Sequence, residues 1–340
     1  HRRRARAPQK GMNFTRNCLG SLAKCRILVI GDVMLDHFIW GHVRRISPEA
    51  PVPIVEVTRE EFYPGGAANV ARNISPFSPH THLMGRVGKD SAADRLRDLL
   101  IADKVDPAPL LVHDTLPTIS KARVSARQQQ IVRVDREKLL PLTADELAEI
   151  EKRLRALAPN LDAIILEDYG KGFMTTELMQ LVSKIAAEHN LIVTVDPSPR
   201  NPLPWSGVTL VKPNRLEAFA AAGLEDHLLP GPPAQNTELL EVGRVLLEKW
   251  AVNSVLVTLG EHGMMLFERG QSPHHIHTRA REVYDVSGAG DTAIALLTLA
   301  LAAGFKLQDA AEIANHASGI VVGKLGTATL TPDELLAAFA

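Results

Sequence analysis

One aspartate at the start of an apolar helix carries the clearest chemical signal in the sequence. In VYDVSGAGDTAIALLTLALAAG, residues 283–304, two glycines flank an alanine directly before Asp291, and an Ala/Leu-rich helical pattern follows. The backbone amides of Gly288, Ala289 and Gly290 at such a helix N-terminus can stabilise a phosphoryl group. The neighbouring carboxylate can accept a proton from an attacking hydroxyl. The pattern therefore indicates an anion-binding site with an adjacent base.

Two other interpretations of this stretch exist. The letters GAGDTA at residues 288–293 satisfy the dinucleotide fingerprint G-x-G-x-x-A. That interpretation is disfavoured, because it puts the Asp291 carboxylate against a pyrophosphate that would repel it. Asp291 could also be a helix-terminal acid that only offsets the helix dipole, which contributes about 0.3–1 kcal/mol. The motif alone favours neither this structural role nor the catalytic one.

A second glycine-rich stretch could bind a polyhydroxyl ligand. The segment YPGGAANVARN, residues 63–73, places Gly65 and Gly66 before Asn69. Paired glycines let a ligand approach the backbone, and asparagine offers both a donor and an acceptor. The alternative is an ordinary tight turn into a helix. The nearby GRVGKDS, residues 85–91, lacks the glycine spacing of a Walker A loop.

Strand-length apolar runs alternate with amphipathic helical patterns along most of the chain. RILVIGD at 26–32, LDAIILED at 161–168 and LIVTVD at 191–196 are typical of strands buried on both faces. This alternation predicts an α/β fold with a mostly parallel central sheet and helices on both faces. Ligands of such sheets bind at the carboxyl ends of the strands. The polar residues that end the predicted strands are Asp32, Glu167, Asp168, Asp196, Lys212 and Asn214.

Two segments interrupt this alternation. Residues 36–61 are rich in proline and β-forming residues, and residues 115–135 alternate polar and apolar residues without a helical period. Both patterns predict antiparallel strands outside the main sheet. We expect them to form a small β lid that covers the site or pairs with a second subunit.

Composition and charge exclude several classes of protein. The chain has 38 Lys and Arg against 39 Asp and Glu, without the basic excess of a nucleic-acid-binding protein. The basic block at residues 1–10 is expected to belong to a partly disordered tail, residues 1–25, before one domain at 26–340. Cys18 and Cys25 are too few for a disulfide framework, and no apolar run could cross a membrane. We expect a cytoplasmic protein without nucleic-acid or membrane partners.

Together the two glycine-rich motifs resemble the PfkB family of carbohydrate kinases, which are related to ribokinase. The first motif runs from Gly65 through Asn69 to Gly88, and the second is DVSGAGD at 285–291. The similarity extends over about residues 26–331. It implies a ribokinase-like fold and ATP-dependent sugar phosphorylation.

Within that family, three segments look like the heptose 7-phosphate kinases of lipopolysaccharide precursor synthesis. They are residues 31–57, EDYGKG at 167–172 and VVGKLGT at 321–327. The likeness implies phosphorylation of the anomeric hydroxyl of D-glycero-β-D-manno-heptose 7-phosphate to the 1,7-bisphosphate, by a kinase-only form without the nucleotidyltransferase that is often fused to it. The alternatives are a PfkB-type kinase of a ketohexose or pentose and a non-catalytic nucleotide-binding regulator.

The resemblance also assigns expected roles to individual residues. Asp291 would be the base, with Gly288, Ala289 and Gly290 as the anion hole. The residues expected to hold the sugar phosphate are Asp32, Asp36, Gly65, Gly66, Asn69, Lys171 and Arg133, with Arg123 and Lys121 as further candidates for its phosphate. Lys171 could equally be an exposed loop lysine.

The remaining expected roles concern the cofactors and the partner subunit. The residues expected at ATP are Asn214, Glu217, Thr258, Gly260, Gly263, Asn315 and Ser318. Asn214 and Glu217 match the family's N-x-x-E element, which implies that they also order Mg²⁺ through water, and their i, i+3 spacing is consistent with this. The alternative for Glu217 is a solvated helix acid. Asp285 would lie beside a candidate K⁺ site. The lid implies a homodimer.

Overall fold

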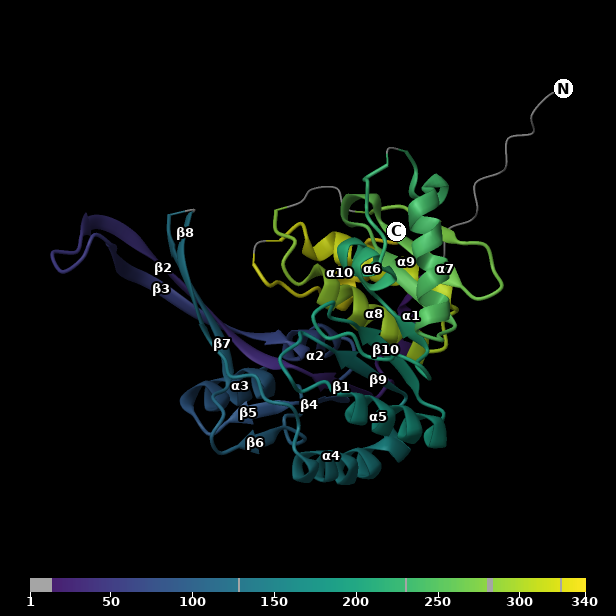
Figure 1. The fold of residues 1–340 in the computed structure, drawn as a ribbon, viewed down its shortest axis with the longest axis horizontal. Coiled ribbons are helices and arrows are strands. Elements are labelled where there is room, and N and C mark those ends of the chain that lie inside the picture. Colours follow the sequence, from purple (N-terminus) through teal and green to yellow (C-terminus); the bar gives the residue numbers. More distant parts are fainter. Residues whose placement is uncertain (1–13, 128, 230, 280–283, 325) are drawn as a thin grey trace.

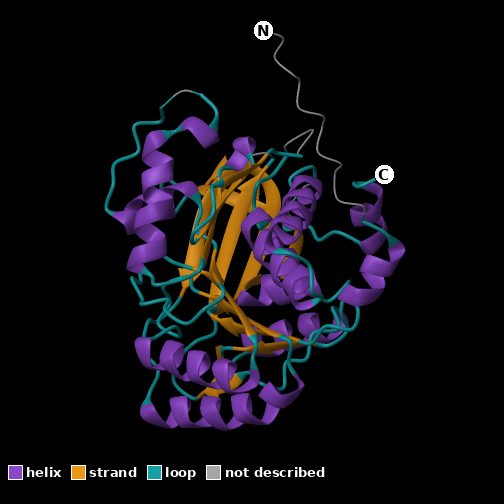
Figure 2. Cartoon of the chain, turned by 90° about the vertical axis from the view of Figure 1, so that its right-hand side faces the viewer, coloured by secondary structure: helices purple, strands orange, loops and turns teal. Residues whose placement is uncertain are grey.

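An eight-stranded sheet forms the centre of the protein, and helices lie on both of its sides (Figures 1 and 2). The computed structural model describes residues 14–127, 129–229, 231–279, 284–324 and 326–340. From one edge to the other the strands are β14 (His274–Ile276), β13 (Met264–Glu268), β12 (Ser254–Thr258), β11 (Leu210–Val211), β10 (Ile192–Asp196), β9 (Ala163–Glu167), β1 (Ile27–Gly31) and β4 (Thr81–Met84). The strands from β4 to β12 are parallel, and β13 and β14 add an antiparallel edge.

Alternate side chains of the central strands enter two separate hydrophobic layers. Ile27 and Val29 of β1 pack into one layer, whereas Leu28 and Ile30 pack into the other. The helices of the first layer are α1 (Arg16–Leu22), α2 (Ala67–Ile74), α3 (Ser91–Ala102), α8 (Ala289–Ala302), α9 (Leu307–Val321) and α10 (Pro332–Ala337). Those of the second are α4 (Ala144–Leu157), α5 (Thr176–His189), α6 (Arg215–Ala222) and α7 (Thr237–Lys249). The predicted three-layer α/β architecture is therefore confirmed.

The register of the central strands brings polar residues to one level. Glu167 at the end of β9 is paired with Gly31 of β1 on one side and with Asp196 of β10 on the other. Because the strands are parallel, their carboxyl ends meet at one edge of the sheet. Residues as far apart in the sequence as Gly31 and Glu167 thus become neighbours.

The lid is a separate four-stranded sheet that extends away from the body (Figure 1). Its strands, in spatial order, are β3 (Pro53–Gly66), β2 (Val33–Ile46), β7 (Ile119–Ala126) and β8 (Gln129–Arg136). The pairs β2/β3 and β7/β8 are antiparallel as expected, but the central pair β2/β7 is parallel. This pairing differs from the prediction because β2 and β7 both begin at the body and run outward. A short parallel pair, β5 (Arg86–Gly88) and β6 (Leu111–His113), lies near the base of the lid.

Part of the segment expected to be a tail belongs to the core. Leu22 and Cys25 are buried, and the Phe14 ring stacks on Phe339 with 5.0 Å between centroids. The basic block at residues 1–10 lies outside the described residues. No helix in the described ranges combines the length and apolar character needed to cross a bilayer.

Candidate active site

The N-terminus of α8 places Asp291 beside the carboxyl ends of β9 and β10. Gly288 precedes the helix with φ +79°, and a Cβ on it would lie 3.1 Å from Asn69 Nδ2, so both its conformation and the space around it favour glycine. Asp291 is in the first turn and only 8% exposed. The Ala289 amide donates to Val286 O at 3.3 Å, whereas the Gly290 amide has no acceptor among the described residues. The helix therefore offers free donors next to a buried carboxylate.

Two side chains from distant parts of the chain hold the Asp291 carboxylate. Asn69 Nδ2 in α2 donates to Oδ2 at 2.6 Å, and the Tyr169 hydroxyl donates to Oδ1 at 2.9 Å. The two glycine-rich motifs thus meet through Asn69 and Asp291, which the sequence predicted for one site. Tyr169 was not predicted. Its position just after the polar end of β9 was the available signal.

Three carboxyl groups, that of Asp291 among them, lie close together with one buried lysine. Oxygens of Glu167, Asp196 and Asp291 all lie within 4.8 Å of one another. Lys212 Nζ lies 2.8 Å from Asp196 Oδ2, and the Lys212 side chain is only 2% exposed. One ammonium therefore faces three carboxylates in a region of low dielectric, where like charges repel strongly.

Burial raises the pKa of each of these acids, and neighbouring negative charges add to the rise for Asp291 and Glu167. Burial, with a further contribution from the Asp196 charge, raises the pKa of Asp291 to about 6, although the bonds from Asn69 and Tyr169 oppose the shift. Burial together with the Asp196 and Asp291 charges raises the pKa of Glu167 well above its ordinary value. Burial also raises the pKa of Asp196, against the effect of Lys212. The single Lys212 ammonium cannot balance three ionised carboxyl groups.

A divalent cation would fit this group of acids. Glu167 Oε2 is buried and has no hydrogen-bond partner among the described residues. Hard cations such as Mg²⁺ prefer carboxylate oxygens. The unpartnered oxygen, the excess negative charge and the close spacing therefore match the needs of such an ion. The sequence placed Glu167 and Asp196 at this edge but gave them no metal role.

The residues expected to order Mg²⁺ form a helix cap. Asn214 Oδ1 accepts from the Glu217 amide at 2.9 Å, and Glu217 Oε2 accepts from the Asn214 amide at 2.8 Å. This reciprocal pair is a capping box at the start of α6. Burial and the nearby Asp196 charge raise the pKa of Glu217, so it faces the same acidic group. Their role with Mg²⁺ stays a prediction.

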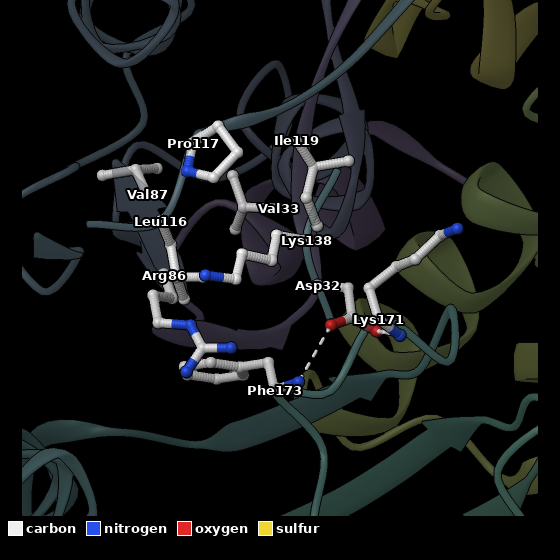
Figure 3. A pocket seen from close by; sticks show the side chains of 10 residues that line it. All are labelled: Asp32, Val33, Arg86, Val87, Leu116, Pro117, Ile119, Lys138, Lys171 and Phe173. Carbon is white, nitrogen blue, oxygen red and sulfur yellow. Dashed lines mark hydrogen bonds between the residues drawn. The ribbon is translucent and has the colours of Figure 1, made fainter. Parts of the chain in front are cut away.

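Asp32 and Asp36 lie on the other side of Asn69, where the lid begins. The Asp32 carboxylate accepts the amides of Tyr169 at 2.9 Å, Lys171 at 3.0 Å and Phe173 at 3.2 Å. Figure 3 shows this carboxylate beside Lys171 and bonded to Phe173. It thereby holds the loop that presents Tyr169, a role distinct from the expected contact with sugar hydroxyls, which stays a prediction.

Gly65 and Gly66 pack closely against Asp36 and Asp32. A Cβ on Gly65 would overlap the Asp36 carboxylate, and one on Gly66, which has φ +59°, would overlap Asp32 O. Asp36 Oδ1 accepts from Arg123 Nη1 at 2.6 Å. The paired glycines are therefore required by close packing, and the expected polyhydroxyl contact of this turn remains to be tested.

The predicted phosphate-binding cations do not all converge. Lys171 Nζ lies 2.6 Å from Glu137 Oε2, with its side chain 10% exposed. Arg133 pairs with Asp135 on the lid at 2.9 Å and is 52% exposed. In Figure 3 the Lys138 side chain extends toward Arg86, across the cavity beside Asp32, whereas the Lys171 side chain points away from Arg86. Lys171 thus lies at the base of the lid, whereas Arg133 lies out on it.

Five of the seven residues expected at ATP line one cleft beside Gly290, and Asn214 and Glu217 do not line it. The cleft has a volume of about 420 Å³, within the range of ligand sites. Apolar residues such as Met264 and Val322 form part of its wall, and Ala289 and Gly290 close one end. The five predicted residues that line it are Thr258, Gly260, Gly263, Asn315 and Ser318. The free donors of α8 therefore lie between this cleft and Asp291.

Asp285, expected near a K⁺ site, lies between the start of α8 and the end of α9. Its Oδ1 accepts from the Ser287 amide at 2.9 Å, and its own amide donates to Val322 O at 3.2 Å. These bonds fix the loop before the helix. The K⁺ ion expected near Asp285 stays a prediction.

Comparisons with known proteins agree with this geometry. The family described as pfkB family carbohydrate kinase matches residues 24–334. The protein named bifunctional protein HldE of Vibrio atlanticus is 43% identical over 309 residues, which are 91% of this chain and 62% of that protein. Its namesake in Desulfatibacillum aliphaticivorans is 40% identical over 93% of this chain and 63% of its own length. The chain thus spans under two thirds of these relatives.

Solved structures support the ribokinase-like fold. Arabidopsis thaliana ribokinase, in complex with ribose and ATP, superimposes with a TM-score of 0.70 at 18% identity, over 93% of this chain and 98% of that one. Phosphofructokinase-2 from Escherichia coli, in complex with potassium, gives a TM-score of 0.70 at 20% identity over the same shares. At this identity the likeness concerns the fold alone.

Asp291→Asn is expected to stabilise the fold. The pKa of Asp291 rises from its ordinary 3.8 to about 6 in the folded protein, so its charge destabilises the fold at pH 7 by about 1–3 kcal/mol. The difference in unfolding free energy between variant and wild type should be largest at pH 7. It should shrink as the pH falls through 6 toward 4, because the wild-type carboxyl then takes up a proton.

Denaturant unfolding at pH 7 and pH 5 measures this difference. Asp309→Asn is the matched control, because Asp309 also lies in the first turn of a helix but outside the acidic group. A variant less stable than the wild type at pH 7 would contradict the charge-crowding argument.

Proposed function

The chain belongs to the pfkB family of carbohydrate kinases, and from that premise we propose that it transfers the terminal phosphate of ATP to the anomeric hydroxyl of D-glycero-β-D-manno-heptose 7-phosphate. One observation carries the proposal: a buried carboxylate held by the sugar-side motif lies at a helix N-terminus that also closes the predicted ATP cleft. The 43% identity to a protein named HldE supports heptose 7-phosphate as the proposed substrate.

In the proposed reaction Asp291 is the base. With its pKa at about 6 it is mostly ionised at pH 7, yet basic enough to accept a proton in the transition state. The Asp291 carboxylate accepts the proton of the anomeric hydroxyl, the sugar oxygen attacks the γ-phosphorus, and the bond to the β-phosphate oxygen breaks to release ADP. Asn69 and Tyr169 keep the carboxylate oriented throughout.

Charge on the transferring phosphoryl group would be met by the start of α8 and by Lys212. A Cβ on Gly290 would lie only 3.7 Å from Lys212 Nζ, so the ammonium is close to the free amide. Preorganised donors of this kind stabilise developing charge without reorganisation. Ala289 and Gly288 shape the same turn.

Glu167 and Asp196 would hold Mg²⁺, with Asn214 and Glu217 as the further ligands expected from the family. When bound, the ion neutralises charge on the ATP phosphates. The unpartnered Glu167 Oε2 supports this assignment. Asp285 is retained as a candidate K⁺ residue at the loop before α8.

A panel of sugars tests the substrate. We expect coupled ADP formation with heptose 7-phosphate, and little with D-fructose or D-ribose at equal concentration. Turnover of fructose or ribose without turnover of heptose 7-phosphate would show a different sugar kinase. Absence of ADP formation with every sugar would favour a nucleotide-binding regulator.

Asp291→Asn tests the base. We expect kcat to fall by at least about 10²-fold, because proton acceptance is lost. In the wild type, kcat/KM should fall as the pH drops below about 6, since the carboxyl then becomes protonated. Asp309→Asn should keep wild-type kinetics; an Asp291→Asn enzyme that did the same would reduce Asp291 to a helix-dipole residue.

We further propose that two copies pair through the lid. β3 and β8 are its edge strands, and exposed edges tend to pair. The exposed apolar residues of the lid are Val43, Ile46, Val52, Val57, Ile131, Val132 and Val134. An apolar surface of this kind on a thin sheet indicates a protein partner.

Sedimentation velocity tests this pairing. The wild type is expected to sediment as a dimer, and Val57→Lys combined with Val134→Lys as a monomer, because charge replaces the apolar contact. Ile101→Lys, an exposed apolar position of α3, should leave the dimer intact. A monomeric wild type would contradict the proposal.

A further inference from the structure

We propose that Asn201, which lies outside the acidic group, is a positioning residue of the reaction. It holds Asp168 and thereby the loop of residues 169–173, whose Tyr169 hydroxyl orients the base. The inference rests on the proposed sugar-kinase function. It concerns how a loop without regular structure keeps the base in one orientation.

The loop of residues 169–173 depends on side chains for its shape. It contains no helix or strand, and none of its residues makes a backbone–backbone hydrogen bond in the described ranges. Gly170 and Gly172 have φ +66° and +92°, values that glycine adopts more readily than other residues. Such a loop keeps one conformation only if other groups accept its amides.

Two buried carboxylates accept the amides of this loop. The Asp32 carboxylate accepts three of them, at 2.9 to 3.2 Å, and Asp168 Oδ1 accepts the amide of Gly170 at 2.8 Å. Asp32 directly follows β1 and Asp168 directly follows β9, and these strands are neighbours in the sheet. Four of the five loop amides are thus bonded to residues at the ends of rigid strands.

Asn201 supports Asp168 from a different loop, the one that follows β10. Its Nδ2 donates to Asp168 Oδ2 at 3.0 Å and also to Met174 O at 3.0 Å. Asp168 is only 5% exposed, and a buried carboxylate that loses a donor is costly. One side chain therefore ties together the residues on either side of the loop, Asp168 and Met174.

A cavity beside the loop leaves it room to move. The volume of this cavity is about 450 Å³, and Gly170, Gly172 and Asn201 are among the residues that line it. Packing is therefore incomplete on this face of the loop. Hydrogen bonds, rather than close contact of side chains, restrain the loop there.

The position of the loop decides where the Tyr169 hydroxyl lies. That hydroxyl donates to Asp291 Oδ1 at 2.9 Å. Hydrogen bonds weaken steeply when their geometry is lost, and a displacement of about 1 Å near the reacting atoms can cost about 10²-fold in rate. Neither the loop nor Asn201 lines the predicted ATP cleft, so nucleotide binding should not depend on them.

Steady-state kinetics of Asn201→Ala with heptose 7-phosphate tests this role. We expect kcat to fall by about 10- to 100-fold, because the loop that carries Tyr169 shifts. The KM for ATP, and the Kd for ADP from calorimetry, should stay within about twofold of the wild-type values. Asn201→Ser, which keeps a shorter donor, should lose less of kcat than Asn201→Ala.

Arg200→Ala is the matched control. Arg200 is adjacent to Asn201, is exposed and lines the same cavity. Its side chain makes no hydrogen bond or salt bridge within the part of the chain that the structure describes. The variant should therefore keep the wild-type kcat.

A double-mutant cycle with Tyr169→Phe separates positioning from a general loss of structure. Tyr169→Phe should lower kcat by about tenfold or more, because it removes a donor to a charged group. Adding Asn201→Ala should lower kcat by less than about threefold more, since no hydroxyl remains to be positioned. A purely structural role of Asn201 would instead multiply the two losses.

Two results would overturn the inference alone: a kcat of Asn201→Ala within about twofold of the wild type, or losses that multiply fully in the double variant. Full turnover by Asp291→Asn would reject the proposed base and the inference together. Turnover of another sugar in place of heptose 7-phosphate would change the proposed substrate but not the inference, because the same cycle is then measured with that sugar.

Discussion

The acidic side chains of the site are close together and have too little positive charge around them, and this imbalance governs the site. Glu167, Asp196 and Asp291 approach within 4.8 Å, and Lys212 is the ammonium paired at 2.8 Å with one of them. Such a group is stable only if protons, donors or a cation compensate it. Asn69 and Tyr169 compensate Asp291, while Glu167 keeps an unpartnered oxygen. The raised pKa values and the fit to a divalent cation both follow from this imbalance.

Two different structural features lie on either side of this charged centre. On one side, the start of α8 closes a partly apolar cleft of nucleotide size. On the other, Asp32 fixes the loop that carries Tyr169 and Lys171, directly where β2 leaves the body for the lid. Rigid strands and helices thus position the chemistry, and the lid begins beside it. This division suits a transfer between two bound molecules.

Much of the site could be predicted from the sequence, because its motifs are local. The glycine turns before α2 and α8 require small residues wherever they occur, and Asn69 and Asp291 stand at fixed offsets from them. Five of the residues that were predicted at ATP line the same cleft. Tyr169 was missed because a tyrosine after a strand has many ordinary roles. The spacing of Asn214 and Glu217, which was expected to order Mg²⁺, forms a helix capping box. A capping box and the expected metal site require the same residues at the same spacing.

By itself the sequence determined the order of strands and helices, the two glycine turns and the family likeness, since each depends on neighbours along the chain. Only the tertiary structure decided which charges face one another. The register of β1, β9 and β10 puts Glu167 beside Asp196, and the outward course of β2 and β7 makes their pairing parallel. The salt bridge of Lys212 and Asp196 has no signature in the sequence, because it depends on a distance across the fold.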